Sequence, residues 1–325
     1  MAGASGEELA AEVTRAGGFG FMYPAGVEGV EVLKSKLDKA RGILGSSAID
    51  PLRIGVGFLG WQLDQKGAKL PDFLAGVLEE RVKAVWFSFG TDLKKWVDFV
   101  REYDGRRSVA HKTLVFVLIN TAEQARVAIN EWKADVVVAQ GIEAGGHGHS
   151  GAPPLFTLLT ELLQEFPSGP PILAAGGLAT GSQVAALLTL GASGAVLGTR
   201  FLLTPESTYT PAQKAALVAA KSSDSTLRTL VFDDLRGTRQ WPGGVDGRGL
   251  RNRAIKEVED GMGLEEATKK MKKSTLADDA DGMVVWAGTG VGVMKEIKPA
   301  GDIVRELHKD ILERFKVSYE SIEDP

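Results

Sequence analysis

The stretch Pro171–Arg200, PILAAGGLATGSQVAALLTLGASGAVLGTR, decides the fold class. It contains two short apolar runs, 171–175 and 194–198, each followed by a glycine-containing turn, with a small-residue amphipathic segment between them. Near-continuous apolar runs of this length are typical of parallel strands that are buried on both faces. No charged residue lies between Glu165 and Arg200, but prolines and glycines divide the stretch at strand and helix spacing. This division favours a buried strand–helix–strand unit over a membrane span.

The same unit recurs along the chain, with amphipathic helices between apolar runs. The runs predicted to be strands are 18–23, 54–59, 84–89, 114–119, 135–139, 171–175 and 194–198. Capping boxes predict helix starts at Ser5, Thr121 and Thr180. Strand and helix alternating at this spacing predict an α/β fold of the (β/α)8 TIM-barrel type.

The predicted barrel is one strand short. Only residues 1–4 precede the capping box that Ser5 forms with Glu8, which is too few for a first strand. Three explanations remain open at this point. The barrel is open at this position, or segment 226–232 (TLRTLVF) fills the gap, or the chain begins downstream of the natural start.

The pattern changes after Pro205. Segment 206–282 contains polar helices, a loop rich in glycine and arginine, and a lysine-rich run, and an apolar, glycine-rich segment then returns at 283. We therefore predict a cofactor-binding barrel made of residues 1–205 and 283–325. A small helical subdomain, residues 206–282, is inserted after the last barrel strand.

Composition narrows the function classes. The 325 residues include 40 glycines and no cysteine, so disulfides, thiolate metal sites and cysteine nucleophiles are excluded. The formal net charge of −4 gives no sign of nucleic acid or of an anionic membrane as a partner. Glu7, Glu8 and Glu12 interrupt the early apolar stretch, which argues against a signal peptide and favours a cytoplasmic location.

Two glycine-rich turns indicate a phosphate site. TIM barrels carry their active sites at the carboxyl ends of the strands and often hold phosphate in the loops after the last two strands. Here those loops contain Gly176 and Gly177 after 171–175, and Gly198 and Thr199 at the end of 194–198. Glycine allows backbone N–H groups to approach phosphate oxygens closely.

The loop after 135–139 carries the candidate catalytic residue. It runs from Gln140 to Gly151 (QGIEAGGHGHSG) and places His147 where a barrel places reacting groups, so His147 is the predicted general base or anion partner. A metal site made of Glu143, His147 and His149 is the weaker alternative, because no fourth ligand is evident, and we predict none. The other two histidines, His111 and His308, are expected to be structural or solvated.

Several segments together resemble the nitronate monooxygenase (2-nitropropane dioxygenase-like) family. The resemblance rests on the opening segment 1–20, on QGIEAGGH at 140–147, and on AAGGLATG at 174–181 followed by GTRF at 198–201. The segments 85–90 (VWFSFG) and 241–252 (WPGGVDGRGLRN) also fit, so the resemblance spans nearly the whole chain.

The resemblance implies an FMN-dependent enzyme that oxidises alkyl nitronates such as propionate 3-nitronate with O2. The products would be a carbonyl compound and nitrite or nitrate. By the same resemblance His147 is the catalytic histidine. The residues implied in flavin binding are Met1, Ala2, Gly3, Gln140, Gly145, Gly146, Gly176, Gly177, Gly198 and Thr199. Family members often carry a polar residue near the flavin after the strand 114–119, where this chain has Leu118 and Ile119.

Other functions use the same scaffold, since a fold does not fix a function. One is an FMN-dependent NAD(P)H reductase of enoyl thioesters or quinones, and another is a flavin-poor paralogue without activity. A dinucleotide site at Gly288–Gly292 is disfavoured because its glycines are spaced G-x-G-x-G. We read these glycines as a further loop beside the flavin. The expected partners are a small nitronate or nitroalkane and O2, with no nucleic acid or membrane partner, and a homodimer is left open.

Overall fold

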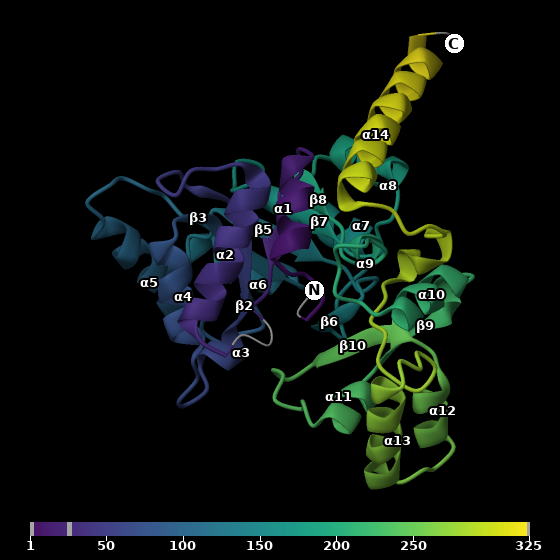
Figure 1. Cartoon of the computed structure of the whole chain (residues 1–325). Coiled ribbons are helices and arrows are strands. Elements are labelled where there is room, and N and C mark those ends of the chain that lie inside the picture. The colour runs from purple at the N-terminus through teal and green to yellow at the C-terminus, as the bar shows by residue number, and fades with distance from the viewer. Residues whose placement is uncertain (1–2, 25–27, 324–325) are drawn as a thin grey trace.

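The computed structural model describes residues 3–24 and 28–323. Seven parallel strands form one curled sheet in the order β1-β2-β3-β4-β5-β7-β8, with helices packed around its outer face (Figure 1). The strands are β1 (Phe21–Met22), β2 (Leu52–Leu59), β3 (Val82–Ser88), β4 (Leu114–Ile119), β5 (Val136–Gln140), β7 (Ile172–Ala175) and β8 (Gly194–Val196). Each of the seven predicted strands is present, and the predicted TIM-barrel class is confirmed.

The helices connect successive strands and then continue into the carboxyl-terminal third. Those of the barrel are α1 (Glu7–Arg15), α2 (Val30–Leu44), α3 (Gly60–Leu63), α4 (Leu70–Glu79), α5 (Lys94–Gly105), α6 (Ala122–Asn130), α7 (Leu155–Glu165), α8 (Gly181–Leu190), α9 (Thr199–Leu202) and α14 (Ala300–Glu323). Between α9 and α14 lie α10 (Pro211–Ala219), α11 (Val231–Arg236), α12 (Arg253–Glu259), α13 (Leu264–Leu276) and the 3-10 turns η1 (Ser223–Ser225) and η2 (Thr289–Val293).

Side chains alternate between the two faces of the curled sheet. Those facing outward pack with the helices into the main core, and those facing inward fill the barrel. Phe21, Trp86 and Phe116 form an aromatic plug inside, with Phe21 5.1 Å from each of the other two rings. Gly55 admits this plug, because a Cβ there would lie 2.1 Å from the Phe21 ring.

The sheet is open between β1 and β8, and the amino-terminal stretch bridges the gap. Ser5, which precedes α1, does not cap this helix. The Ser5 hydroxyl donates to the Phe21 carbonyl, and the Ser5 carbonyl accepts from the Tyr23 N–H. Ala4 accepts from Thr208 N–H on the other side of the gap. Below this bridge α1, α9 and α14 meet in a small apolar cluster. The first of the three explanations, an open barrel, describes this structure.

A second sheet lies next to the barrel. It has three antiparallel strands, with β10 (Val245–Leu250) between β6 (Gly146–His149) and β9 (Thr226–Thr229). Segment 226–232 therefore does not fill the gap in the barrel, because β9 pairs with β10. The loop predicted after Gln140 also contains strand β6. Segment 206–282 thus holds two strands in addition to its helices.

Helix capping agrees with the sequence in part. Thr180 and Gln183 form the predicted capping box at α8. At α6, Thr121 accepts from Gln124 N–H as predicted, but the Gln124 side chain accepts from Asn120 N–H instead of completing the box. The charge-free stretch before Arg200 is divided between β7, α8 and β8, and among the described residues no helix is long and apolar enough to cross a membrane.

The long helix α14 docks on the amino end of α8. Asp310 accepts hydrogen bonds from Ser182 N–H at 2.7 Å and from the Ser182 hydroxyl at 3.1 Å. Burial alone would raise the pKa of Asp310, but these bonds and Arg314 lower it. Beyond this contact α14 extends away from the barrel (Figure 1).

We expect Asp310→Ala to lower the free energy of unfolding by about 1 kcal/mol at neutral pH, the scale of a lost helix cap. A lowered pKa in the folded state means that the carboxylate stabilises the fold above its unfolded pKa and loses this effect as the pH falls. Denaturant unfolding should therefore separate variant from wild type at neutral pH and bring them together in acid. Glu313→Ala, which removes an exposed partner of Lys309 on the same helix, should change little.

Candidate active site

His147 is held by a buried carboxylate. Its Nε2 lies 2.9 Å and 3.0 Å from the two carboxylate oxygens of Asp233, which is fully buried in α11. The Thr238 hydroxyl donates to the same carboxylate at 2.8 Å. A carboxylate can only accept here, so Nε2 carries a proton and Nδ1 is the acceptor nitrogen of the neutral ring.

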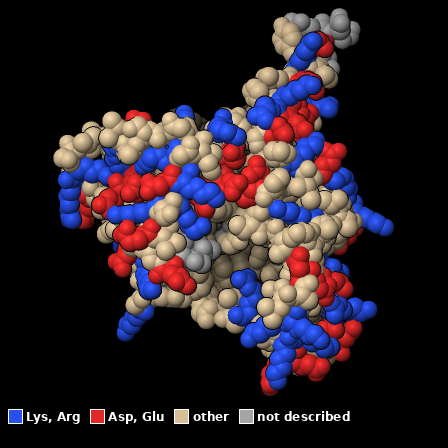
Figure 2. All heavy atoms as spheres, in the orientation of Figure 1, with Lys and Arg blue, Asp and Glu red and all other residues tan. Residues whose placement is uncertain are grey.

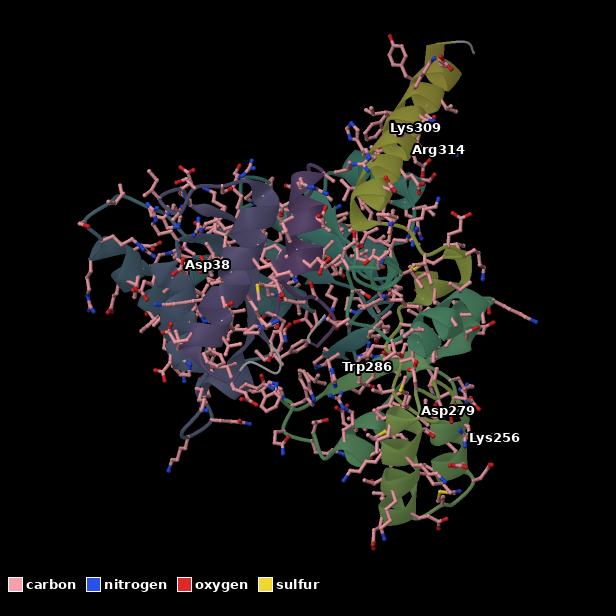
Figure 3. The ribbon with its side chains drawn as sticks, viewed as in Figure 1. Asp38, Lys256, Asp279, Trp286, Lys309 and Arg314 are labelled. Carbon is pink, nitrogen blue, oxygen red and sulfur yellow. The ribbon has the colours of Figure 1, made fainter. Side chains whose placement is uncertain are left out.

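Aromatic rings fix the imidazole. Trp241 stacks on it with ring centres 3.6 Å apart, and Trp286 meets its edge at 5.0 Å. Trp286 lies beside β10, between the barrel and helices α11 and α13 (Figure 3). Trp241 also packs against Trp61 and Phe89, which follow β2 and β3. His147 is thereby placed at the carboxyl ends of the barrel strands, as predicted.

The other candidate metal ligands do not converge on His147. Both Glu143 carboxylate oxygens accept from Leu155 N–H at 3.0 Å, at the start of α7. His149 points its Nδ1 at Gly151 N–H, 3.1 Å away. Within residues 3–24 and 28–323 no group of three such side chains could hold a metal ion. His111 bonds to the Val82 carbonyl, and His308 is exposed on α14.

The two predicted phosphate turns present free backbone donors. Gly176 and Gly177 have φ values of +118° and +69°, a conformation that favours glycine. Apart from the β7–β8 pairing, which engages Gly176, the N–H groups of Gly177, Gly198 and Thr199 have no acceptor among the described residues. Consecutive N–H groups in such a turn form a concave anion site. The geometry fits the phosphate of a nucleotide cofactor.

The loop 287–290 joins this site to the His147 loop. Gly288 N–H donates to the Thr199 hydroxyl at 3.0 Å, and Thr289 N–H donates to the Glu143 carbonyl at 3.0 Å. Gly145 is required for the contact, because a Cβ there would lie 2.3 Å from Gly288 N. Gly288 and Gly290 therefore belong to a loop beside the two glycine turns. That this loop also lies beside a flavin stays a prediction.

Gln140 ends β5 and faces the barrel mouth. Asn120, directly after β4, donates from Nδ2 to the Gln140 side-chain and main-chain oxygens at 2.9 Å and 3.0 Å. Only the two Gln140 oxygens take part in this pairing, and the Gln140 side-chain NH2 group does not. Asn120 also supplies a polar group directly after Leu118 and Ile119, the last two residues of β4.

The amino-terminal stretch reaches the same end of the barrel. The Gly3 carbonyl accepts from the Thr208 hydroxyl at 2.7 Å, and Ala4 packs with Ala179, two residues beyond the phosphate turn. Gly146 begins β6 with a φ of +71°. Met1 and Ala2, also expected to line the cofactor, lie outside the described residues.

Two arginines lie in the second sheet near the barrel mouth, and one of them, Arg228, forms an ion pair with Asp246. Arg228 and Arg248 are paired across β9 and β10, and both project from the sheet face opposite His147. Burial, followed by the charge of Arg228, lowers the pKa of Arg248. Arg228 is nine-tenths buried, yet its Nη1 has no partner among the described residues. A Cβ on Gly148 would lie 3.4 Å from this nitrogen and 3.0 Å from Gln140 Oε1, which places the orphan donor at the barrel mouth.

The molecular surface is hollowed next to this site. Figure 2 shows a depression between the barrel and the helices α11–α13, lined mainly by uncharged residues.

Like Arg228 Nη1, the indole N–H groups of Trp61 and Trp241 are buried without a partner among the described residues. Unpaired buried donors are uncommon in folded proteins and indicate a missing acceptor. The donor set suits an anionic or oxygen-rich ligand.

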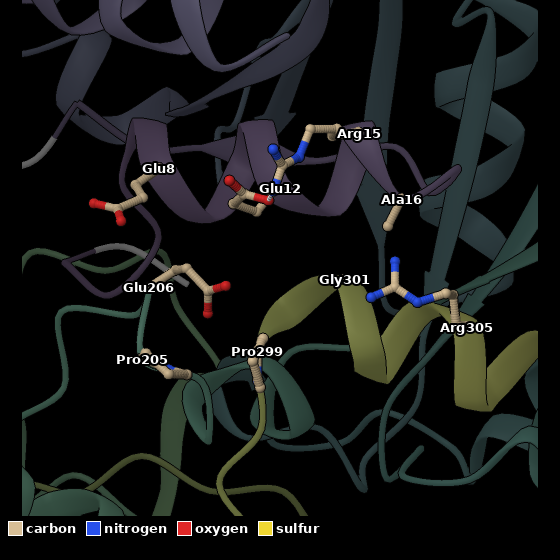
Figure 4. A pocket seen from close by; sticks show the side chains of 9 residues that line it. All are labelled: Glu8, Glu12, Arg15, Ala16, Pro205, Glu206, Pro299, Gly301 and Arg305. Atoms are coloured by element: carbon tan, nitrogen blue, oxygen red, sulfur yellow. Dashed lines mark hydrogen bonds and ion pairs between the residues drawn. The ribbon is translucent and has the colours of Figure 1, made fainter.

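A separate cleft of about 400 Å³ lies on the outside of the barrel, between α1 and α14 (Figure 4). Three carboxylates line it, those of Glu8, Glu12 and Glu206, and all three have partners. Glu8 pairs with Lys39 at 3.4 Å. Glu12 pairs with Arg15, and Glu206 accepts from Ala300 N–H at the start of α14. This cleft shares no residue with the His147 site.

Several site residues had no signal in the sequence. Asp233 lies 86 positions from His147, in a segment that reads only as a polar helix. Trp241 stood in a segment that resembles the family, but nothing in the sequence pairs it with His147. Asn120 could have been found, because it is the next inward-facing position after Leu118 on a strand of period two.

The sequence of the chain is similar to those of known enzymes. Residues 66–310 match the nitronate monooxygenase family. The chain is 34% identical to a nitronate monooxygenase of Neurospora crassa, over 95% of this chain and 86% of that protein.

Two solved structures are similar over nearly their whole length. A nitroalkane oxidase from Streptomyces ansochromogenes gives a TM-score of 0.77 at 28% identity, covering 97% of this chain and 94% of that one. FabK from Thermotoga maritima gives 0.76 at 27% identity, covering 99% and 93%. The family match and the structural similarity together make this an oxidoreductase of a flavin-dependent class, and the chain belongs to the nitronate monooxygenase family.

Proposed function

We propose that this enzyme uses FMN and O2 to oxidise alkyl nitronates of the propionate 3-nitronate kind to a carbonyl compound and nitrite or nitrate. The observation that carries the proposal is the arrangement at the barrel mouth. A histidine oriented by a buried carboxylate stands at the same end of the barrel as two glycine turns with free N–H groups. FMN, when bound, would accept electrons from the nitronate and pass them to O2.

The residues that would hold FMN fall into two groups. Gly176, Gly177, Gly198 and Thr199 would donate backbone N–H bonds to the phosphate, and the loop 287–290 supports them. Gln140, Gly145 and Gly146 would flank the ring, together with the amino-terminal stretch Met1–Gly3. The orphan Arg228 Nη1 beside Gln140 supports this assignment, because a cation there would favour an anionic or electron-rich ring system.

His147 would act on the substrate. A nitronate is already a carbanion equivalent, so it needs no strong base. Because Nε2–H is bound to Asp233, the imidazole would orient the anion in its doubly protonated form, by donating from Nδ1. The depression between the barrel and the helices α11–α13 is lined mainly by uncharged residues, which would suit the alkyl part of a nitronate (Figure 2). Trp241 and Trp286 restrict the approach of water to the imidazole and hold its plane.

Oxygen uptake tests the proposal. The purified protein should be yellow, contain one FMN per chain, and consume O2 when propionate 3-nitronate is added without NAD(P)H. The rival function, an NAD(P)H-dependent reductase, predicts no uptake with the nitronate and rapid oxidation of NAD(P)H with an enoyl thioester or a quinone. A protein that stays colourless with added FMN would support the inactive paralogue.

A further inference from the structure

The loop between α11 and β10 places Trp241 over His147. Residues 237–244 (GTRQWPGG) form this loop, which reaches from α11 toward α3 on the barrel (Figure 1). Trp241 covers one face of the imidazole, Trp286 meets an edge and Asp233 binds Nε2, so only 10% of the His147 side chain is exposed. A ligand larger than water therefore has little room to reach His147 while Trp241 stays in place.

Residues 240–243, called the flap below, are tied to the rest of the protein at both ends. At one end the Thr238 N–H donates to the Asp233 carbonyl at 2.9 Å, and at the other the Gly244 carbonyl accepts from the Ser150 N–H at 2.7 Å. Between these ties, the backbone of the first two flap residues forms no hydrogen bond with any part of the chain that the structure describes. Segments with few backbone hydrogen bonds open locally at low free-energy cost.

The barrel side of the contact is a rigid aromatic socket. It consists of Trp61 and Phe89, which follow β2 and β3 and have ring centres 5.3 Å from that of Trp241. The Trp61 N–H donates to the Phe89 carbonyl at 3.1 Å, and a Cβ on Gly60 would lie 2.8 Å from Gly90 Cα. Phe89 is held at a φ of +54°, which is uncommon for a bulky residue. Because these two barrel loops are fastened to each other, the flap is the side of the contact that can move.

The closed flap gains and loses free energy at the same contact. The Trp241 ring packs against the rings of His147, Trp61 and Phe89, and this removal of aromatic surface from water is favourable. The same packing leaves the indole N–H of Trp241 buried without a partner among the described residues. An unmade hydrogen bond in a buried place is costly, and opening the flap lets this N–H bond to water. The closed state is therefore favoured by less than its ring contacts alone would give.

We propose that the flap is a gate over the His147 site, and that Trp241 leaves the socket to admit substrate and to release product. This inference rests on the proposed function in one respect, namely that the substrate must reach His147. The open flap exposes a face of the imidazole, and the closed flap keeps water away from the bound ligand. Loop motions of this kind take microseconds to milliseconds in enzymes.

Fluorine NMR of the flavin-bound enzyme tests for the motion itself and needs no substrate. The chain has six tryptophans, so labelling with 5-fluorotryptophan gives six resonances, and Trp241→Phe identifies that of Trp241. We predict microsecond-to-millisecond exchange, or a second resonance, for Trp241. Trp96 on α5, whose indole N–H donates to Asp64 at 2.9 Å, should give one sharp resonance. A single Trp241 resonance without exchange would overturn the gate.

Chemical modification tests whether the flap limits access to His147. Diethyl pyrocarbonate modifies histidines, and peptide mass spectrometry gives the rate at each of the four in this chain. A closed gate admits the reagent only for the fraction of time that it is open, and a minor open state is populated to at most about 10%. Trp241→Ala should therefore speed modification of His147 by about tenfold or more. An unchanged rate at His147 would overturn the gate.

Two controls belong to the modification experiment. His308, which is exposed on α14, should react at the same rate in both proteins and serves as the reference within each molecule. Trp96→Ala, the same substitution on the outside of the barrel, should leave the rate at His147 unchanged. If Trp241→Ala does not fold, the fluorine spectrum of the wild-type enzyme still decides the question.

Neither measurement uses a nitronate, so the gate and the proposed function can fail separately. If the enzyme oxidises no nitronate but Trp241 exchanges and shields His147, the proposed function is wrong and the gate stands. If the enzyme oxidises the nitronate while Trp241 gives one resonance without exchange, the proposed function stands and the gate is rejected.

Discussion

His147→Asn should lower kcat with neutral nitroalkanes by about 10²–10⁴-fold, the usual range for loss of a general base. Activity with preformed nitronates should fall much less, because the proton is already gone. The structure gives the reason, since the imidazole lies at the carboxyl ends of the strands with Nε2 bound to Asp233 and Nδ1 available. Steady-state oxygen uptake with the two substrate forms measures the difference.

Two variants separate loss of the base from structural damage. His147→Asn leaves the buried Asp233 without its main partner, whereas the amide of His147→Gln can still donate to that carboxylate. Both variants lack a basic nitrogen, so both should lose nitroalkane activity even where His147→Gln retains more stability. His149→Asn should have little effect, because His149 bonds to Gly151. A larger loss from His149→Asn than from His147→Asn would contradict the assignment.

Gly177→Val should abolish stable flavin binding. A Cβ at this position would lie 2.8 Å from the Thr289 hydroxyl oxygen and 2.9 Å from Glu143 Cβ, so the turn and the loop 287–290 are forced apart. Each hydrogen bond from a backbone N–H to a phosphate is worth about 1.5–3 kcal/mol. Loss of one or two of them should raise the dissociation constant of FMN by about tenfold to several hundredfold or more.

Gly45→Val controls for backbone strain. Gly45 ends α2 with a φ of +62°, close to the +69° of Gly177, but a Cβ there would meet nothing within 4 Å. Both variants therefore carry a similar conformational penalty, and only Gly177→Val disturbs the phosphate turn. Flavin fluorescence titration should show normal affinity in Gly45→Val. Full flavin occupancy in Gly177→Val would show that the phosphate lies elsewhere.

The barrel could be predicted because each of its strands contains an apolar run that can be recognised in the local sequence. β4 is an uninterrupted apolar run, LVFVLI, and the structure places it at Leu114–Ile119 as predicted. The glycine turns that we propose to hold phosphate were also local signals, since Gly176 follows β7 directly and Gly198 comes two residues after β8. A parallel strand that is buried on both faces must be apolar along nearly its whole length, so its composition identifies it.

The second sheet escaped prediction for the opposite reason. β6 reads GHGH and has no apolar or β-branched residue, and β10 reads VDGRGL, in which only the end residues Val245 and Leu250 are apolar. Neither segment has the run of apolar or β-branched residues that marks a strand. Their glycines are needed for packing; a Cβ on Gly247, for example, would lie 2.5 Å from the Trp286 ring. The sheet forms because distant segments meet, which one sequence read locally does not reveal.

The open edge of the barrel shows a further limit. The absence of a strand before α1 was visible in the sequence, but the way the gap is bridged was not. Ser5, expected to cap α1, instead bonds to β1, and Ala4 bonds to Thr208 across the gap. The same residue type serves both purposes, so the capping pattern alone does not distinguish them.

Anaerobic reduction of the bound flavin tests the central claim most directly. The flavin-loaded enzyme is mixed with propionate 3-nitronate in the absence of oxygen, and the visible flavin absorbance is followed. We predict that the nitronate bleaches the flavin within the turnover time and that O2 restores its colour, with NAD(P)H having no comparable effect. Flavin that stays oxidised with the nitronate but is bleached at once by NAD(P)H would contradict the account.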